Sequence, residues 1–178
     1  NLFANANGSD APLFRHFVGG LQGYLPALAP MFAPNVNSFR RMRPDHGAPI
    51  NVQWGSDNRS CGLRVPITDR HNRRVENRLP GADANPYLAM AATLVAGYLG
   101  MTEELEPSPK TSGNAYNFER TLPRSLEEAL ERFNDCDPVR ALLGDYFFRS
   151  FTSIKAAELE AFQGVISSWE RDHLLLKV

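Results

Sequence analysis

Apolar residues recur at helical spacing near both ends of this 178-residue chain. Near the start they predict a helix that Ser9 or Asp10 caps and that has Pro12 in its first turn. Its apolar stripe comprises Leu13, Phe17, Leu21, Tyr24, Leu25 and Leu28. Near the end the pattern predicts one long helix over Phe151–Trp169. Its buried side is expected to contain Phe151, Ile154, Phe162, Val165, Ile166 and Trp169.

Three glycines, Gly19, Gly20 and Gly23, interrupt the first apolar stripe. Glycine lowers helix propensity, but it also lacks the side chain that keeps two backbones apart. We therefore expect the first helix to pack closely against a neighbouring element.

Short β-rich runs bounded by Gly, Pro, Asn or Asp occupy the middle of the chain. They predict three strands joined by turns, at Asn51–Trp54, Cys61–Val65 and Arg73–Leu79.

The third predicted strand alternates between charged and apolar residues. Side chains two positions apart share a face of a strand, so Arg74, Glu76 and Arg78 are expected to line one face. Val75 and Leu79 point the other way, toward a packed layer. A carboxylate between two guanidinium groups should stay ionised at neutral pH. It can pair with these arginines, or it can bind a divalent metal that also holds a phosphate.

A further helix is predicted after the strands. Asp83 or Asn85 caps it, Pro86 lies in its first turn, and it runs to about Gly100. The polar segment Glu103–Thr121, rich in Pro, Ser and Gly, is predicted to be a surface excursion of the same domain.

Two shorter helices are predicted beyond this excursion. A capping box at Ser125–Glu128 opens one that ends near Asn134, and Asp137-Pro138 opens the other. Together the elements predict an α+β fold, with an antiparallel sheet and helices packed on one of its faces. The length favours a single domain over residues 1–178.

Composition excludes several classes of protein. Hydrophobic residues make up 43% and charged residues 22% of the chain, as in an ordinary globular protein. A pI near 6.5 argues against a general nucleic-acid binder. No run approaches the roughly 18 apolar residues of a membrane span. Cys61 and Cys136, without nearby His pairs, are typical of reduced thiols in a cytoplasmic protein.

Positive charge is concentrated between Arg40 and Arg78. This window holds nine arginines, no lysine and four acidic residues, a net charge of +5 in a chain whose total is −1. Guanidinium groups bind carboxylate and phosphate bidentately, so the window predicts an anion site. A solvated basic face or surface ion pairs are the alternative explanation. The window lacks the interleaved aromatics of a single-strand platform, and no nucleic-acid partner is expected.

Five motifs follow one another in and after this window. They are Trp54-Gly55, Asn58-Arg59-Ser60, Arg64-Val65-Pro66, Val75-Glu76-Asn77-Arg78 and Gly81-Ala82-Asp83-Ala84-Asn85-Pro86-Tyr87-Leu88. Together with Asn35–Arg41 they resemble the C-terminal catalytic half of the glutamine synthetase family, over about residues 1–178. The resemblance implies part of a catalytic half-barrel, with active sites between the subunits of a ring-shaped homo-oligomer.

The resemblance also implies which residues bind the substrates. Arg41 and Arg78 match the arginines that hold the carboxylates of L-glutamate. Arg59 matches the catalytic arginine that reaches the transferred phosphoryl group, and so contacts both ATP and glutamate. Arg64 and Arg74 match arginines that bind the nucleotide phosphates.

Glu76 matches a ligand of the metal between ATP and glutamate, so ATP and Mg²⁺ (or Mn²⁺) are the implied cofactors. The local chemistry agrees with this assignment. Attack of a glutamate γ-carboxylate on ATP brings two anions together, and that step needs dense positive charge and metal. The expected activity is an ATP-dependent ligase that joins glutamate to an amine, in the cytoplasm.

The sequence departs from the ammonia-using members of the family at Gly47. Those members carry a glutamate six residues after the arginine matching Arg41, and that glutamate helps deprotonate ammonium. A glycine cannot do so, and it leaves room for a bulkier nucleophile. The chain is most similar to the glutamate–putrescine ligase (γ-glutamylpolyamine synthetase) branch. Asp45 or His46 could deprotonate the amine, although a histidine there is equally compatible with a solvated loop residue.

Two alternatives to a polyamine ligase stay open: an ammonia-using glutamine synthetase and a non-catalytic remnant. The chain begins at Asn1 without the histidine motif, the other acidic metal ligands or the small N-terminal domain of the family. We therefore interpret it as the C-terminal portion of the catalytic domain, and we expect these 178 residues alone to have no ligase activity.

Overall fold

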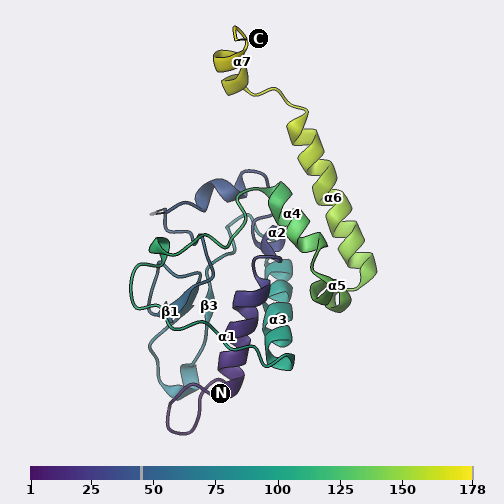
Figure 1. Ribbon diagram of the computed structural model, residues 1–178. Coiled ribbons are helices and arrows are strands. Elements are labelled where there is room, and N and C mark those ends of the chain that lie inside the picture. The colour runs from purple at the N-terminus through teal and green to yellow at the C-terminus, as the bar shows by residue number, and fades with distance from the viewer. Residues whose placement is uncertain (45, 178) are drawn as a thin grey trace.

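A computed structural model describes residues 1–44 and 46–177 (Figure 1). The described residues form seven α-helices: α1 (Pro12–Tyr24), α2 (Ala29–Phe32), α3 (Pro86–Thr102), α4 (Leu126–Asn134), α5 (Asp137–Leu143), α6 (Asp145–Gln163) and α7 (Ser168–Leu174). They also form three short strands, β1 (Trp54–Ser56), β2 (Leu63–Val65) and β3 (Glu76–Asn77). Single 3-10 turns lie at η1 (Ser38–Arg41), η2 (Arg70–Asn72) and η3 (Ala115–Asn117). The predicted α+β class is confirmed.

The sheet has the order β1-β2-β3, and one of its two pairings differs from the prediction. β2 and β3 are antiparallel as predicted, but β1 and β2 are parallel, with Trp54 opposite Leu63. Parallel neighbours usually need a crossover of a dozen or more residues. These strands are only three residues long and advance about 10 Å, so the short segment 57–62 is enough to return the chain. Asp57 starts this return with a positive φ of 44°.

Helices α1 and α3 lie side by side against the sheet (Figure 1). Their closest approach is at Gly20 and Gly100: a Cβ built on Gly100 would lie 2.3 Å from the Gly20 Cα. Glycine is required at both positions because any side chain would enter the opposite backbone. The predicted close packing of the first helix is therefore confirmed.

The caps predicted from the sequence account for the starts of α3 and α4 but not for the start of α1. Pro12 is in the first turn of α1 as predicted, but its N-cap is Ala11, and neither Ser9 nor Asp10 caps it. The reason is local, because Ser9 hydrogen-bonds Asn5 and Asn7 in the preceding turn. The predicted Asn85 cap is confirmed, but only half of the predicted capping box at Ser125–Glu128 forms, because the Glu128 side chain accepts from the Arg124 amide. The Asn85 side chain accepts hydrogen bonds from the first turn of α3, and the Ser125 side chain accepts one from α4.

Two apolar clusters hold the elements together. The larger joins α1 and α3 to the inner face of the sheet, where Leu63, Val65 and Leu79 are fully or almost fully buried. The smaller joins η1 to α4 through Phe39, Met42, Leu126, Ala129 and Leu130. This second cluster fixes the segment that carries Arg40 and Arg41 against the start of α4.

The C-terminal region differs from the predicted single long helix. Helix α6 ends at Gln163, Gly164 follows as its C-cap, and a capping box formed by Ser167 and Glu170 starts α7. Within the predicted buried side only Phe151 is buried; Ile154, Phe162, Val165, Ile166 and Trp169 are 50–68% exposed. The periodicity is that of an amphipathic helix, but in the described chain this segment leaves the body of the molecule, and α7 lies apart from it (Figure 1).

Among the described residues, no helix combines the length and apolar character needed to cross a membrane.

Candidate functional site

The charged residues of β2 and β3 meet at one face of the sheet. Arg64 and Glu76 are direct partners in the antiparallel register. Arg64 Nη1 donates to Glu76 Oε2 at 2.6 Å, and Arg64 Nη2 donates to Asp57 Oδ1 at 2.7 Å. The hydrogen bond with Glu76 raises the pKa of Arg64, burial opposes this, and Asp57 adds to it. Arg64 is thus held between two carboxylates.

Glu76 is not flanked by Arg74 and Arg78 in the manner predicted from strand alternation. Arg78 Nε lies 3.6 Å from Glu76 Oε1, but the second partner is Arg64 from the neighbouring strand. Arg74 instead donates to the carbonyl oxygen of Asn72 at 3.1 Å. The strand β3 contains only residues 76 and 77, so Arg74 lies outside the ladder and the two-residue repeat does not extend to it.

Arg78 connects the strand to two loops. Its Nη2 donates to the carbonyl oxygen of Gly47 at 3.0 Å. Its Nη1 donates to the carbonyl oxygen of Cys61 at 3.2 Å and also to that of Arg59. Burial raises the pKa of the Cys61 thiol to about 11, so this neighbour is neutral at physiological pH. The guanidinium predicted to bind glutamate therefore holds the Gly47 and Arg59 loops together.

Arg41 lies at the end of η1 and is partly buried beside Gly81. Its Nη2 donates to the carbonyl oxygen of Leu79, next to Arg78 in the chain. Burial lowers the pKa of Arg41, and the charge of Asp83 opposes this. Arg41 and Arg78, the two predicted glutamate-carboxylate ligands, are thus brought to the same end of β3.

Asp83 anchors the loop before η1, a role that the sequence did not predict. Its Oδ2 accepts hydrogen bonds from the Ser38 hydroxyl and, at 3.2 Å, from Asn35 Nδ2. Burial raises the pKa of Asp83, but these hydrogen bonds and the charge of Arg41 outweigh it, so the pKa lies below its ordinary value of 3.8. The Gly-Ala-Asp-Ala-Asn-Pro motif is the sequence signal at this position.

The lowered pKa of Asp83 predicts a pH-dependent contribution to stability. A group whose folded pKa is depressed stabilises the fold above its unfolded pKa of about 3.9 and loses that contribution as the pH falls through the folded value. Asp83→Asn should therefore lower the free energy of unfolding at pH 7, and the gap to wild type should close below about pH 4. Urea unfolding at pH values from 3 to 7 measures this gap. A gap that stays constant across the series would contradict the prediction.

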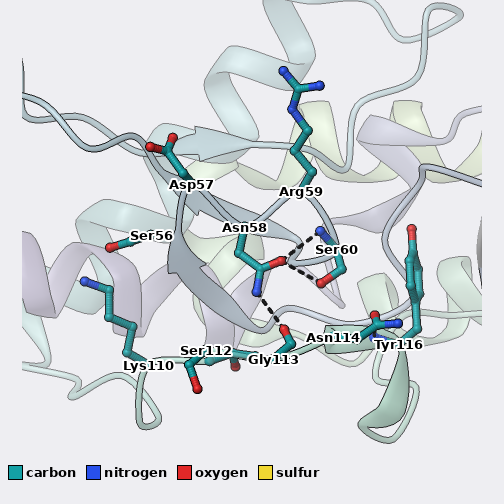
Figure 2. Close-up of a pocket in the computed structure, with 11 residues that line it drawn as sticks. Ser56, Asp57, Asn58, Arg59, Ser60, Lys110, Ser112, Gly113, Asn114 and Tyr116 are labelled. Atoms are coloured by element: carbon teal, nitrogen blue, oxygen red, sulfur yellow. Dashed lines mark hydrogen bonds between the residues drawn. The ribbon is translucent and has the colours of Figure 1, made fainter.

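Arg59 lies on the exposed loop between β1 and β2. Figure 2 shows its side chain extending away from Asn58 and Ser60, on the opposite side from Lys110. Within residues 1–44 and 46–177, no side chain pairs with the Arg59 guanidinium. The loop borders a groove of about 790 Å³, whose other wall is Lys110–Asn114 with Tyr116. Arg59 is the predicted phosphoryl-binding residue, and its guanidinium is open to solvent.

The polar segment 103–121 fixes the loop that carries Arg59. Asn58 Nδ2 donates to the carbonyl oxygen of Gly113 at 2.8 Å (Figure 2). The Ala115 amide donates to Ser60 Oγ at 2.8 Å. Asn58 Oδ1 in turn accepts from the amide and the hydroxyl of Ser60 at 3.0 and 2.6 Å. The predicted surface excursion therefore forms the wall that positions the Arg59 loop. The polar Gly-Asn-Ala-Tyr run is the sequence signal that accompanies these hydrogen bonds.

A metal needs more ligands than the described chain provides. In that part of the structure, no group of three His, Cys, Asp or Glu side chains is placed to hold an ion. Glu76 is the one predicted ligand, and both of its oxygens face arginines. The described residues thus offer one ligand of a metal site and do not complete its coordination sphere. Asp45 lies outside the described residues, and His46 is exposed.

Comparison with known proteins shows the family of the chain. Residues 1–174 match the family described as glutamine synthetase, catalytic domain. The chain belongs to the glutamine synthetase family. The γ-glutamylputrescine synthetase of Escherichia coli K12 is 38% identical over 176 residues, which cover 98% of this chain and 37% of that relative. The glutamine synthetase of Thermococcus kodakarensis is 37% identical over 178 residues, covering 94% of this chain and 40% of that relative.

Solved structures of the glutamine synthetase family agree with the fold. GmaS without ligand superposes with a TM-score of 0.87 and 30% identity, over 98% of this chain and 41% of GmaS. GmaS in complex with ADP gives a TM-score of 0.85, 29% identity, and coverage of 98% and 42%. The chain thus spans about two fifths of the length of these relatives.

Proposed function

We propose that the complete gene product is an ATP-dependent carboxylate–amine ligase that joins the γ-carboxylate of L-glutamate to an amine. The observation that supports this most directly is the gathering of Arg41, Arg64, Glu76 and Arg78 around β2 and β3, next to the exposed Arg59. Membership of the glutamine synthetase family, and relatives that are glutamate–amine ligases by name, give the reaction class.

The proposed reaction has two steps. A γ-carboxylate oxygen attacks the terminal phosphorus of ATP, giving γ-glutamyl phosphate and ADP. The amine nitrogen then attacks the acyl carbon, a C–N bond forms, phosphate leaves and the nitrogen loses a proton. Both steps concentrate negative charge, so their main requirement is fixed positive charge in a defined geometry.

Each arginine has a distinct place in this proposal. Arg41 and Arg78 would bind the glutamate carboxylates at the end of β3. Arg64 and Arg74 would face the nucleotide phosphates, and Arg59 would contact the phosphoryl group in transfer. A complex of the related GmaS with ADP supports nucleotide binding by this fold.

ATP and Mg²⁺, or Mn²⁺, are the cofactors of the proposed reaction. A divalent metal would neutralise phosphate charge, and Glu76 would supply one oxygen ligand to it. The remaining ligands would come from outside the described residues, within the longer chain that the relatives have or from a second subunit. We propose a ring-shaped homo-oligomer for the same reason, since a site open on one side needs a further wall.

A polyamine such as putrescine is the acceptor we propose. Gly47 has a positive φ of 75°, and a Cβ built on it would meet nothing within 4 Å. The position therefore has open space where ammonia-using relatives carry a glutamate, and this space suits a nucleophile larger than ammonia. The E. coli relative named for putrescine supports this reading. Ammonia is the alternative acceptor, favoured by relatives named glutamine synthetase.

The test is ADP release by the complete gene product with Mg-ATP and glutamate. Ammonium, putrescine, longer polyamines and ethanolamine are compared as acceptors, each at equal concentration of its free amine. We expect release with the diamines and little with ammonium. Faster ADP release with ammonium than with the diamines would contradict the polyamine assignment but remain consistent with a ligase. No ADP release with any acceptor would favour a non-catalytic remnant.

A further inference from the structure

A second cluster of arginines lies away from the proposed ligase residues. It surrounds a cavity of about 240 Å³ between η1 and the segment that precedes α4. The four arginines are Arg40, Arg43, Arg120 and Arg124. The rest of the lining is Val36, Phe39, Met42 and Ser125. None of these residues belongs to the predicted glutamate, ATP or metal site.

The two walls of this cavity are held together by the fold. Phe39 and Met42 are buried in one apolar cluster with Leu126, so η1 and the start of α4 cannot separate without exposing that cluster. Arg120 Nη2 also donates to the carbonyl oxygen of Met42, which joins the walls directly. The arginines are therefore presented by a fixed frame, although Arg40, Arg43 and Arg124 are themselves exposed.

Glu128 is the acidic residue whose charge acts on the cavity in the part of the chain that the structure describes. Burial lowers the pKa of Arg120 and the nearby charge of Arg124 lowers it further, while Glu128 opposes both effects. The Glu128 carboxylate is already engaged, by the amide of Arg124 at 2.7 Å and by the Arg132 guanidinium at 2.7 Å. Among residues 1–44 and 46–177, none of the four arginines forms an ion pair with a carboxylate.

We propose that this cavity binds a small phosphate anion of the diphosphate class. Four guanidinium groups match a ligand with several negative oxygens better than a single carboxylate, because each can donate bidentately. The volume is below the roughly 300 Å³ at which pockets begin to enclose drug-sized ligands. The anion therefore fits inside, and any nucleoside attached to it would lie outside the cavity. This site is independent of the ligase assignment.

Titration calorimetry of the 178-residue chain tests the proposal, with free diphosphate as the probe in metal-free buffer. Arg43→Gln and Arg124→Gln each remove an exposed guanidinium that makes no hydrogen bond or ion pair within the described chain. Each is expected to weaken diphosphate binding about tenfold, and the double variant more. Arg149→Gln, an exposed arginine on α6, is the matched control and should bind like wild type.

Three further measurements distinguish a free diphosphate from a nucleotide, and this cavity from the proposed ligase residues. ADP that binds more tightly than diphosphate, with the same sensitivity to Arg43→Gln, would support the site and assign it to a nucleotide. Arg43→Gln should weaken diphosphate binding by the same factor whether or not Arg59→Gln is present, and it should leave binding of glutarate unchanged. Equal weakening in Arg149→Gln, no weakening in Arg43→Gln or Arg124→Gln, or tighter binding of glutarate than of diphosphate would each overturn the proposal. Circular dichroism and thermal unfolding confirm that the variants stay folded.

Discussion

Arg59→Gln in the complete gene product is expected to lower kcat about a thousandfold with little change in the KM for ATP. The reason is that the backbone of the Arg59 loop is fixed, whereas the Arg59 side chain has no partner in the described chain. Arg78 and the Asn58 and Ser60 contacts fix the loop, while the Arg59 guanidinium stays open to solvent. Such a group meets its partner only when a phosphoryl group arrives, and charge there is worth most in the transition state. Steady-state ADP release gives both constants.

Two companion variants make this prediction specific to Arg59. Arg149→Gln removes another exposed guanidinium, one that pairs with Asp145 on α6, and should leave kcat unchanged. Arg59→Lys keeps one positive charge but loses the planar fork, and it should recover only part of the rate. A kcat within a few fold of wild type for Arg59→Gln would remove Arg59 from the proposed reaction and leave the other arginines to be tested.

Gly100→Ala is expected to destabilise the fold by about 3 kcal/mol. The added Cβ would lie 2.3 Å from the Gly20 Cα and 2.3 Å from the carbonyl oxygen of His16. Both contacts are with backbone, so no side chain can rotate to relieve them and α1 must move away from α3. Urea unfolding of the 178-residue chain at pH 7 measures the loss.

Gly23→Ala is the matched control for this helix pair. Its Cβ would meet the Leu105 Cδ1 at 3.6 Å, an ordinary contact, and alanine has the higher helix propensity. Its stability should stay within about 1 kcal/mol of wild type. A Gly100→Ala variant as stable as Gly23→Ala would show that the two helices tolerate a wider spacing than the structure indicates.

Features set by neighbouring residues could be predicted from the sequence. The Asn85 cap with Pro86 and the start of α4 at Ser125 depend on hydrogen bonds within one turn, so local chemistry determines them. The same holds for the inward-facing Leu79. The parallel pairing of β1 with β2 could not be predicted, because strand patterns give the faces of a strand and not its partner's direction.

The features of the candidate site that could not be predicted from the sequence depend on contacts between distant segments. The hydrogen bonds from Asn58 to Gly113 and from Ala115 to Ser60 join residues that are 55 positions apart, and no local pattern encodes them. Arg64 pairs with Glu76 through cross-strand register, which overrides the alternation within β3. The exposure of Trp169 could not be predicted, because an amphipathic pattern identifies an apolar helix face but does not show whether another part of the same chain packs against it.

Most N–H donors of the Arg78 guanidinium are already engaged in hydrogen bonds. A guanidinium carries five N–H donors. Nη1 supplies Arg59 and Cys61, Nη2 supplies Gly47, and Nε faces Glu76 at 3.6 Å. Within the described part of the chain, two hydrogens make no hydrogen bond, one on Nη2 and the one on Nε that faces Glu76, and a bidentate grip on a carboxylate takes two. A carboxylate bound by Arg78 would therefore either take the place of Glu76 beside Nε or displace a backbone carbonyl, and in the second case it would loosen the Gly47 loop or the Arg59 loop.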